Sequence, residues 1–175
     1  MNTQELKLKL IELDACKEAK EFCEGKDLET AWRECPRGDW MLWLYVRLYP
    51  LNKRQITLAK GHCANTVRHL MKDERSIKAV DVAIKYGNNE ATEEELKEAA
   101  YAAVAAAANA AAAYSDAAAA AAAANAANAA NAAYAYAAAA AVAAADAAAD
   151  DDAADAAKNK NQLETAAICR KYLTV

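Results

Sequence analysis

Glycine and proline are scarce in this chain, with four and two copies among 175 residues. Scattered glycines do not build the glycine-rich loops that cradle phosphate groups, and the sequence has no GxSxG motif for a nucleophilic serine. Residues 99–157 contain neither glycine nor proline, and they also lack Cys, His, Glu, Lys, Arg and Thr. That segment can hardly be a catalytic centre, and we expect the protein not to be an enzyme.

Cysteine and histidine occur in patterns that argue against a disulfide scaffold and a metal centre. The five cysteines form no regular framework and no CxxC motif, so we expect free thiols, with Cys16 and Cys23 buried in the core. His62, Cys63 and His69 are the one grouping that suggests a metal. The two histidines are about 10 Å apart along a helix, which is too far for one ion. We therefore predict no metal and no cofactor.

Long hydrophobic runs are also missing. The N-terminus, MNTQELKLKLIEL, alternates charge with leucine and does not resemble a signal peptide. Asn125, Asn128 and Asn131 interrupt the alanine-rich run, so we expect no membrane span. Reduced thiols then favour the cytoplasm. The pI of about 5.3 and the scattered basic residues argue against a nucleic-acid partner.

Alanine is abundant instead, supplying 42 of the 59 residues from 99 to 157. It is the best helix former because it loses no side-chain entropy and buries no polar group. One helix of that length would run about 88 Å, too long for a protein of this size. We expect it to fold back at Ser115–Asp116 and at Asp150–Asp152, giving helices over 92–113, 116–149 and 152–172.

Larger apolar residues are concentrated before residue 99 and near the C-terminus. The sequence therefore predicts a single all-α domain over 1–175, a multi-helix bundle. Residues 1–90 form helices with larger side chains, and residues 91–175 form closely packed alanine-rich helices plus a C-terminal docking helix. In the first half we expect helices ending near Leu13 and spanning 15–24, 28–35, 40–49, 53–71 and 74–86.

Polar residues mark where these helices begin. Asp14, Asp27, Asp39 and Asp73 are expected N-caps, and Thr92 with Glu95 reads as a capping box. In the C-terminal helix we expect large and small apolar side chains to dock on the N-terminal core: Leu163, Ala166, Ala167, Ile168, Cys169, Tyr172 and Leu173.

Two surface groups are candidates for binding a protein partner. Arg68, His69, Lys72 and Arg75 lie in a dense charge run between two helices, within a segment (47–85) of net charge +6. This run is either a partner-facing patch or a solvated corner with local ion pairs. Trp40 and Trp43 are either core anchors or partner anchors, since tryptophan is enriched in interface hot spots.

Several longer motifs carry a family resemblance. They are RGDWMLWL (Arg37 to Leu44), ITLAK (Ile56 to Lys60), CANTVRHLMKDERSIKAV (Cys63 to Val80) and the ending ICRKYL (Ile168 to Leu173), with a YG turn, a TEEEL helix start and an alanine-rich stretch between. Over roughly residues 14–173 the chain resembles a family of bacterial and phage-borne immunity proteins, the Imm5-like domain. The resemblance implies a protein that binds and neutralises a cognate toxin.

Two alternatives stay open. The first is a phage or mobile-element inhibitor of a host defence complex, which would need a similar surface. The second is a structural protein that forms a homodimer through an alanine face. A toxin gene next door favours the immunity hypothesis, a phage gene neighbourhood favours the first alternative, and a concentration-dependent mass favours the second.

Overall fold

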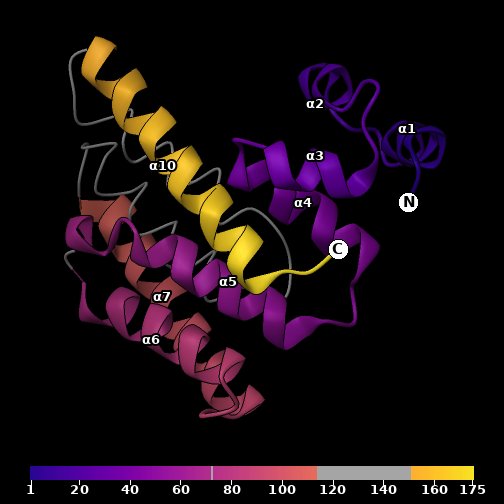
Figure 1. The fold of residues 1–175 in the computed structure, drawn as a ribbon. Coiled ribbons are helices and arrows are strands. Elements are labelled where there is room, and N and C mark those ends of the chain that lie inside the picture. Colours follow the sequence, from indigo (N-terminus) through magenta and orange to yellow (C-terminus); the bar gives the residue numbers. More distant parts are fainter. Residues whose placement is uncertain (72, 114–150) are drawn as a thin grey trace.

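A computed structural model describes residues 1–71, 73–113 and 151–175, and every regular element within these ranges is helical (Figure 1). The predicted all-α fold is confirmed. The expected helix over 116–149 lies outside the described residues. The helices are α1 (Thr3–Glu12), α2 (Lys17–Phe22), α3 (Leu28–Glu34), α4 (Gly38–Leu48), α5 (Lys53–Asn65), the 3₁₀ turn η1 (Arg68–Leu70), α6 (Glu74–Gly87), α7 (Glu93–Ala113) and α10 (Asp151–Tyr172).

Three of the predicted helix starts are confirmed by their hydrogen bonds. The Asp27 carboxylate accepts the backbone N–H of Thr30 at 2.8 Å, and Asp73 accepts that of Arg75 at 2.9 Å. Thr92 and Glu95 exchange side-chain and backbone bonds, which makes the expected capping box before α7. Each bond satisfies an N–H group that the first helical turn cannot pair internally.

Two predicted caps are wrong. Asp14 has a left-handed backbone, with φ of 52°, and α2 begins after Cys16. The N-cap of α4 is Arg37, so Asp39 lies inside the first turn of that helix. Its carboxylate accepts from the Arg37 guanidinium, with Nε to Oδ1 at 2.9 Å, and this pairing replaces a capping bond.

The helix expected over 53–71 ends early, at Asn65. The Thr66 hydroxyl donates to the Cys63 carbonyl at 2.7 Å, and the Thr66 backbone N–H bonds to that same carbonyl. Hydrogen bonds between residues three apart tighten the last turn of a helix. The β-branched Val67, which is a weaker helix former, follows directly. The chain then continues as the separate 3₁₀ turn η1.

Small residues set the packing of α5, α6 and α7, which lie side by side (Figure 1). Ala79 of α6 packs with Ala99, Ala100 and Ala103 of α7 in one buried cluster. At Gly61 of α5 an added Cβ would lie 2.9 Å from a side-chain carbon of Ile84 in α6. The short side chains let the helix backbones approach closely, as the alanine content predicts.

The C-terminal helix α10 docks on α4 and α5, as expected. Ala166, Cys169 and Leu173 are buried there. Gly38 of α4 meets Thr165 of α10 so closely that it has no space for a Cβ. Leu163 does not dock, since it is 56% exposed, because it lies on the outer face of the helix. Ala167 is exposed as well.

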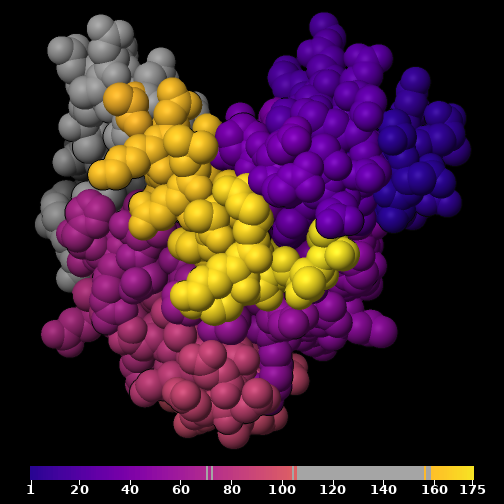
Figure 2. Space-filling model, in the orientation of Figure 1, coloured from indigo at the N-terminus to yellow at the C-terminus, as the bar shows by residue number. Residues whose placement is uncertain are grey.

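The helices α1, α2 and α3 form a lobe with larger side chains, seen beside α10 in the space-filling view (Figure 2). Cys16 is exposed and Cys23 is half-buried, so the expectation that both lie in the core is wrong. The cause is that α2 is only six residues long and has no fully buried residue. Among the described helices, none is long and apolar enough to cross a bilayer.

Candidate functional site

The predicted charge run lies where η1 leads into α6. Arg68 donates to Asp81 through both terminal nitrogens, with Nη2 to Oδ2 at 2.9 Å. Arg75 donates to Asp73, with Nε to Oδ1 at 3.0 Å and Nη2 to Oδ2 at 2.7 Å. His69 is exposed beside Arg68, while Lys72 lies outside the described residues.

These two arginine–aspartate pairs are bidentate forks that change the electrostatics of the run. Hydrogen bonds from Arg68 lower the pKa of Asp81, and those from Arg75 lower the pKa of Asp73. Both carboxylates therefore stay ionised and offset the positive charge beside them. The surface presents alternating, oriented charges of both signs.

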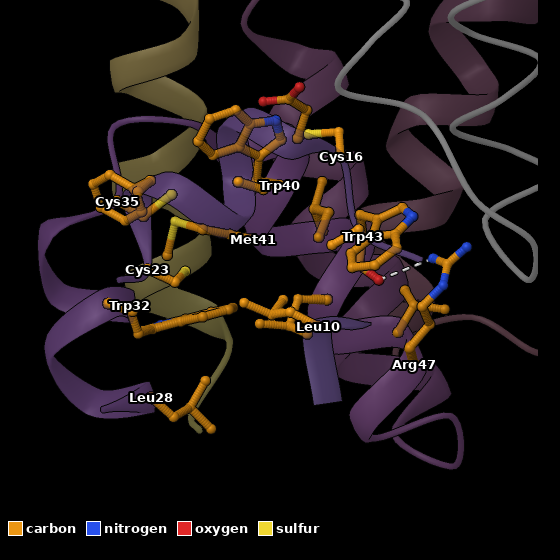
Figure 3. Close-up of a pocket in the computed structure, with 18 of the residues that line it drawn as sticks. Leu10, Cys16, Cys23, Leu28, Trp32, Cys35, Trp40, Met41, Trp43 and Arg47 are labelled. Atoms are coloured by element: carbon orange, nitrogen blue, oxygen red, sulfur yellow. Dashed lines mark hydrogen bonds between the residues drawn. The ribbon is translucent and has the colours of Figure 1, made fainter. Parts of the chain in front are cut away.

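A second feature, which the sequence did not predict, is a cavity of about 300 Å³ between the N-terminal lobe and α4 (Figure 3). Figure 3 places Cys23, Cys35 and Trp32 on one side, Trp43 and Arg47 on the opposite side, and Met41 and Leu10 between them. We call it the lobe cavity. Its described lining comes from α1 (Leu10), the α1–α2 turn and α2 (Asp14, Ala15, Cys16, Ala19, Phe22, Cys23), α3 and its end (Leu28, Ala31, Trp32, Cys35), α4 (Asp39, Trp40, Met41, Leu42, Trp43, Leu44, Val46, Arg47) and α5 (Lys60).

Arginines fix two of the tryptophans in the wall of the lobe cavity. The Arg37 guanidinium lies 4.6 Å from the ring centroid of Trp40, and that of Arg47 lies 4.1 Å from the ring of Trp43. Arg47 also donates to the Trp43 carbonyl at 3.1 Å. Both tryptophans are half-buried, so the expectation of core anchors holds only in part.

Trp32 presents a different environment. Trp32 is only 8% exposed, and its ring contacts the ring of Tyr45 at a centroid distance of 5.9 Å. Its Nε1–H group is fully buried and has no acceptor among the residues that the structure describes. Buried donors normally have a partner, because an unpaired one loses its hydrogen bond to water without replacement.

Lys60 is the most deeply buried charged residue named among the described core, with 1% exposure. Burial lowers its pKa to about 8, because leaving water disfavours the ammonium form. Lys60 is not among the predicted site residues. Its spacing in the sequence indicates burial, because Lys60 follows Ile56 by four residues and precedes Cys63 by three, and so lies on the buried face of α5.

Two of the thiols that line the lobe cavity, those of Cys23 and Cys35, are poor nucleophiles. Burial raises the pKa of Cys23, and it raises that of Cys35 to about 11. Such thiols stay protonated near neutral pH, and the thiolate is the reactive form. At these two positions the lobe cavity therefore offers binding surface rather than an activated sulfur.

The histidine–cysteine grouping does not come together in the described part of the chain. His62 stacks on Tyr172 with ring centroids 4.4 Å apart, while the Cys63 thiol faces the Thr165 carbonyl of α10. His69 lies on the surface. Within residues 1–71, 73–113 and 151–175, no three histidine, cysteine or acidic side chains are grouped to hold a metal ion.

Comparison of the chain with protein-family models, curated proteins and solved structures finds no match.

Proposed function

We propose that the protein is an immunity-type inhibitor that binds a bacterial toxin and neutralises it by covering its surface. The observation that carries this proposal is the pair of forks, Arg68–Asp81 and Arg75–Asp73, beside the exposed His69. Forked pairs hold charges in fixed positions and orientations. Fixed charges of both signs give a protein interface its specificity and speed its association.

The mixed sign of this surface favours a protein over a nucleic acid. A phosphate backbone attracts clustered cations and is repelled by ionised carboxylates. Here Asp73 and Asp81 both remain ionised beside the arginines. A protein partner can match both signs, so the surface suits that class of partner better.

The forks also coincide with the longest motif behind the family resemblance. That motif runs from Cys63 to Val80 and contains Arg68, Asp73 and Arg75, and Asp81 follows it directly. A toxin-binding role for the segment is therefore consistent with both the resemblance and the geometry.

The test combines capture with rescue. The tagged chain is used to recover partners from cells of its native host, and each recovered protein is expressed alone and together with the chain. We expect a protein that stops growth when expressed alone and is tolerated in the presence of the chain. The Arg75→Glu variant should reduce recovery by about tenfold, because it reverses one charge of a fork.

Lys7→Glu is the matched control, since it makes the same charge change at an exposed position of α1. Both variants should stay folded, because exposed ion pairs contribute about 0–1 kcal/mol to stability. If Arg75→Glu and Lys7→Glu recover the partner equally, the forks are not the binding surface. Recovery of a host defence component would favour the defence-inhibitor alternative, and recovery of this chain alone would argue against both inhibitor hypotheses.

A further inference from the structure

We propose that the lobe cavity is a binding site for a small neutral apolar molecule, about the size of two fused aromatic rings. The cavity lies between the N-terminal lobe and α4, whereas the two arginine–aspartate forks lie at η1 and α6. The inference therefore does not depend on the proposed inhibitor function. It rests on the volume of the cavity, on the way its aromatic wall is held, and on the state of the charged residues in its lining.

The volume of the lobe cavity sets the size of the ligand. Protein interiors pack as densely as organic crystals and contain few voids larger than a water molecule. Apolar cavities of about 150 Å³ stay dry and bind benzene. The lobe cavity measures about 300 Å³, at the lower end of the range for small-molecule sites. It therefore has space for two fused rings.

Cations hold three aromatic rings of the wall in position. Lys26 Nζ lies 3.7 Å from the ring centroid of Phe22, and it donates to the Phe22 carbonyl at 2.8 Å. Trp40 and Trp43 each carry a stacked arginine guanidinium. Phe22 and Trp40 also contact each other, with ring centroids 6.2 Å apart. Because these contacts fix the rings, the wall is preorganised, and little free energy is lost in ordering it when a ligand binds.

The rest of the described lining is mostly apolar. Leu10 and Met41 supply aliphatic surface in the middle of the cavity (Figure 3). The thiols of Cys23 and Cys35 have raised pKa values, so they are uncharged near neutral pH. The Nε1–H of Trp32 is fully buried, so a ligand atom does not reach it. Such a wall favours a ligand whose apolar surface leaves water.

The charged residues of the lining favour a ligand without charge. The described lining has two acidic and two basic residues, whose formal charges cancel: Asp14, Asp39, Arg47 and Lys60. Asp14 and Arg47 are exposed to water. The Asp39 carboxylate accepts from Arg37, and Lys60 has an interaction partner of its own. An ion entering the cavity would lose its hydration without meeting an unpaired buried counter-charge, which is unfavourable.

The first experiment varies the charge on one ring system. Naphthalen-2-ylmethanol, 2-naphthoate and naphthalen-2-ylmethylammonium share two fused rings and are neutral, anionic and cationic near pH 7. Binding of each probe to the full chain is measured by isothermal titration calorimetry. We expect saturable one-to-one binding of the alcohol and at least about tenfold weaker binding of both ions. An ion that binds as tightly as the alcohol, or an alcohol that does not saturate, would overturn the proposal.

Ala31→Leu tests whether the alcohol occupies the cavity itself. Ala31 is 5% exposed and lines the cavity, so a leucine there takes up part of the volume. Binding of naphthalen-2-ylmethanol should fall by more than about tenfold, while the one-ring probe benzyl alcohol, which needs less space, should lose less than about threefold. Ala105→Leu, at an exposed position of α7, is the matched control and should keep full affinity for both probes. Unchanged naphthalen-2-ylmethanol binding by Ala31→Leu would place the probe elsewhere on the protein and refute the proposal.

Ala19→Leu keeps the test decisive if Ala31→Leu does not fold, which circular dichroism shows directly. Ala19 lines the same cavity and is only half-buried in α2, so a larger side chain is tolerated more easily there. The folded variant should bind naphthalen-2-ylmethanol at least about threefold more weakly. Full affinity in this variant would also count against the site. Arg75→Glu, which breaks a fork, should bind the probe like the native chain, so the result separates this site from the inhibitor surface.

Discussion

At the scale of single residues, the environment of Lys60 matters more than its type. Lysine is almost never fully buried in proteins unless its charge has compensation. Here it lies on α5 between the small residues Ala59 and Gly61, with 1% exposure. Its short neighbours let adjoining helices close over it, and the result is a lowered pKa of about 8.

This lowered pKa predicts how stability changes with pH. The unfolded chain holds the Lys60 proton up to its ordinary pKa of about 10.5, while the folded protein releases it near 8. Unfolding therefore takes up a proton between these values, and stability rises with pH through that window. Well below pH 8 Lys60 is protonated in the folded protein, so burying its ammonium group lowers the free energy of unfolding by the full desolvation cost.

We expect the unfolding free energy of the native chain, relative to the Lys60→Met variant, to rise by about 1 kcal/mol between pH 7 and 9. Methionine keeps an unbranched side chain and removes the charge. Urea denaturation of both proteins at each pH measures the difference. The comparison cancels the contribution of Cys35, whose raised pKa of about 11 acts in the opposite direction. A difference that does not change with pH would contradict this account of Lys60.

Gly38 gives a second prediction at this scale. A Cβ on Gly38 would collide with both the side chain and the backbone of Thr165, so α4 and α10 would have to separate. Gly38→Ala should destabilise the protein by about 1–3 kcal/mol, the usual cost of overpacking. Chemical denaturation measures this loss, and the exposed Lys7→Ala change on α1 serves as the control. Equal stability of the two variants would show that this contact is looser than described.

At the scale of helices, the sequence predicts best those features that depend on hydrogen bonds between residues close in the chain, such as helix caps. The Thr92–Glu95 capping box needs only residues three apart, and its sequence identified it correctly. Asp39 failed as a predicted cap because the Arg37 guanidinium competes for its carboxylate. The predicted burial of Cys16 is wrong because residue spacing shows which residues share a helix face but not whether another element covers that face.

The lobe cavity could not be predicted for a related reason. Its walls come from α1 to α5, and its volume depends on how far large side chains hold those helices apart. Periodicity identifies which side of α3 carries Leu28, Ala31 and Trp32, but it does not give the distance to α4. The buried Trp32 donor becomes visible only when the neighbouring atoms are placed.

Alanine contacts between α6 and α7 give a prediction about helix packing. Ala103 is fully buried in this contact, whereas Ala105 on the same helix is exposed. Ala103→Leu should lower the unfolding free energy by about 1–3 kcal/mol, because the added atoms force the helices apart. Ala105→Leu should change it by less than about 0.5 kcal/mol. Urea denaturation followed by helical circular dichroism separates the two. Similar losses in both variants would mean that α7 does not depend on its alanine face.

At the scale of the whole molecule, the uneven composition raises the question of cooperativity. The lobe formed by α1, α2 and α3 uses large side chains, while α6 and α7 meet through alanine. Two elements join these regions. The helix α10 packs on both α4 and α5, and α4 contributes Met41, Leu42 and Tyr45 to the same core as Ala166 and Leu173.

This shared core predicts that the chain unfolds in one step, as expected for a single domain. All three tryptophans, Trp32, Trp40 and Trp43, lie in α3 and α4, so their fluorescence reports on the N-terminal region. Far-ultraviolet circular dichroism weights every helix, including the alanine-rich ones. In a two-state transition, probes of different regions give the same midpoint.

We expect the fluorescence and dichroism curves in urea to superimpose, and Leu173→Ala to move both midpoints together. Leu173 is 2% exposed at the junction of α10 with the N-terminal core, and truncating a buried leucine costs about 2–5 kcal/mol. Leu163→Ala, at an exposed position of the same helix, is the control and should move neither midpoint appreciably. If Leu173→Ala shifts the fluorescence curve alone, the N-terminal lobe and the alanine-rich helices unfold as separate units, and the boundary between them lies at the α10 contact.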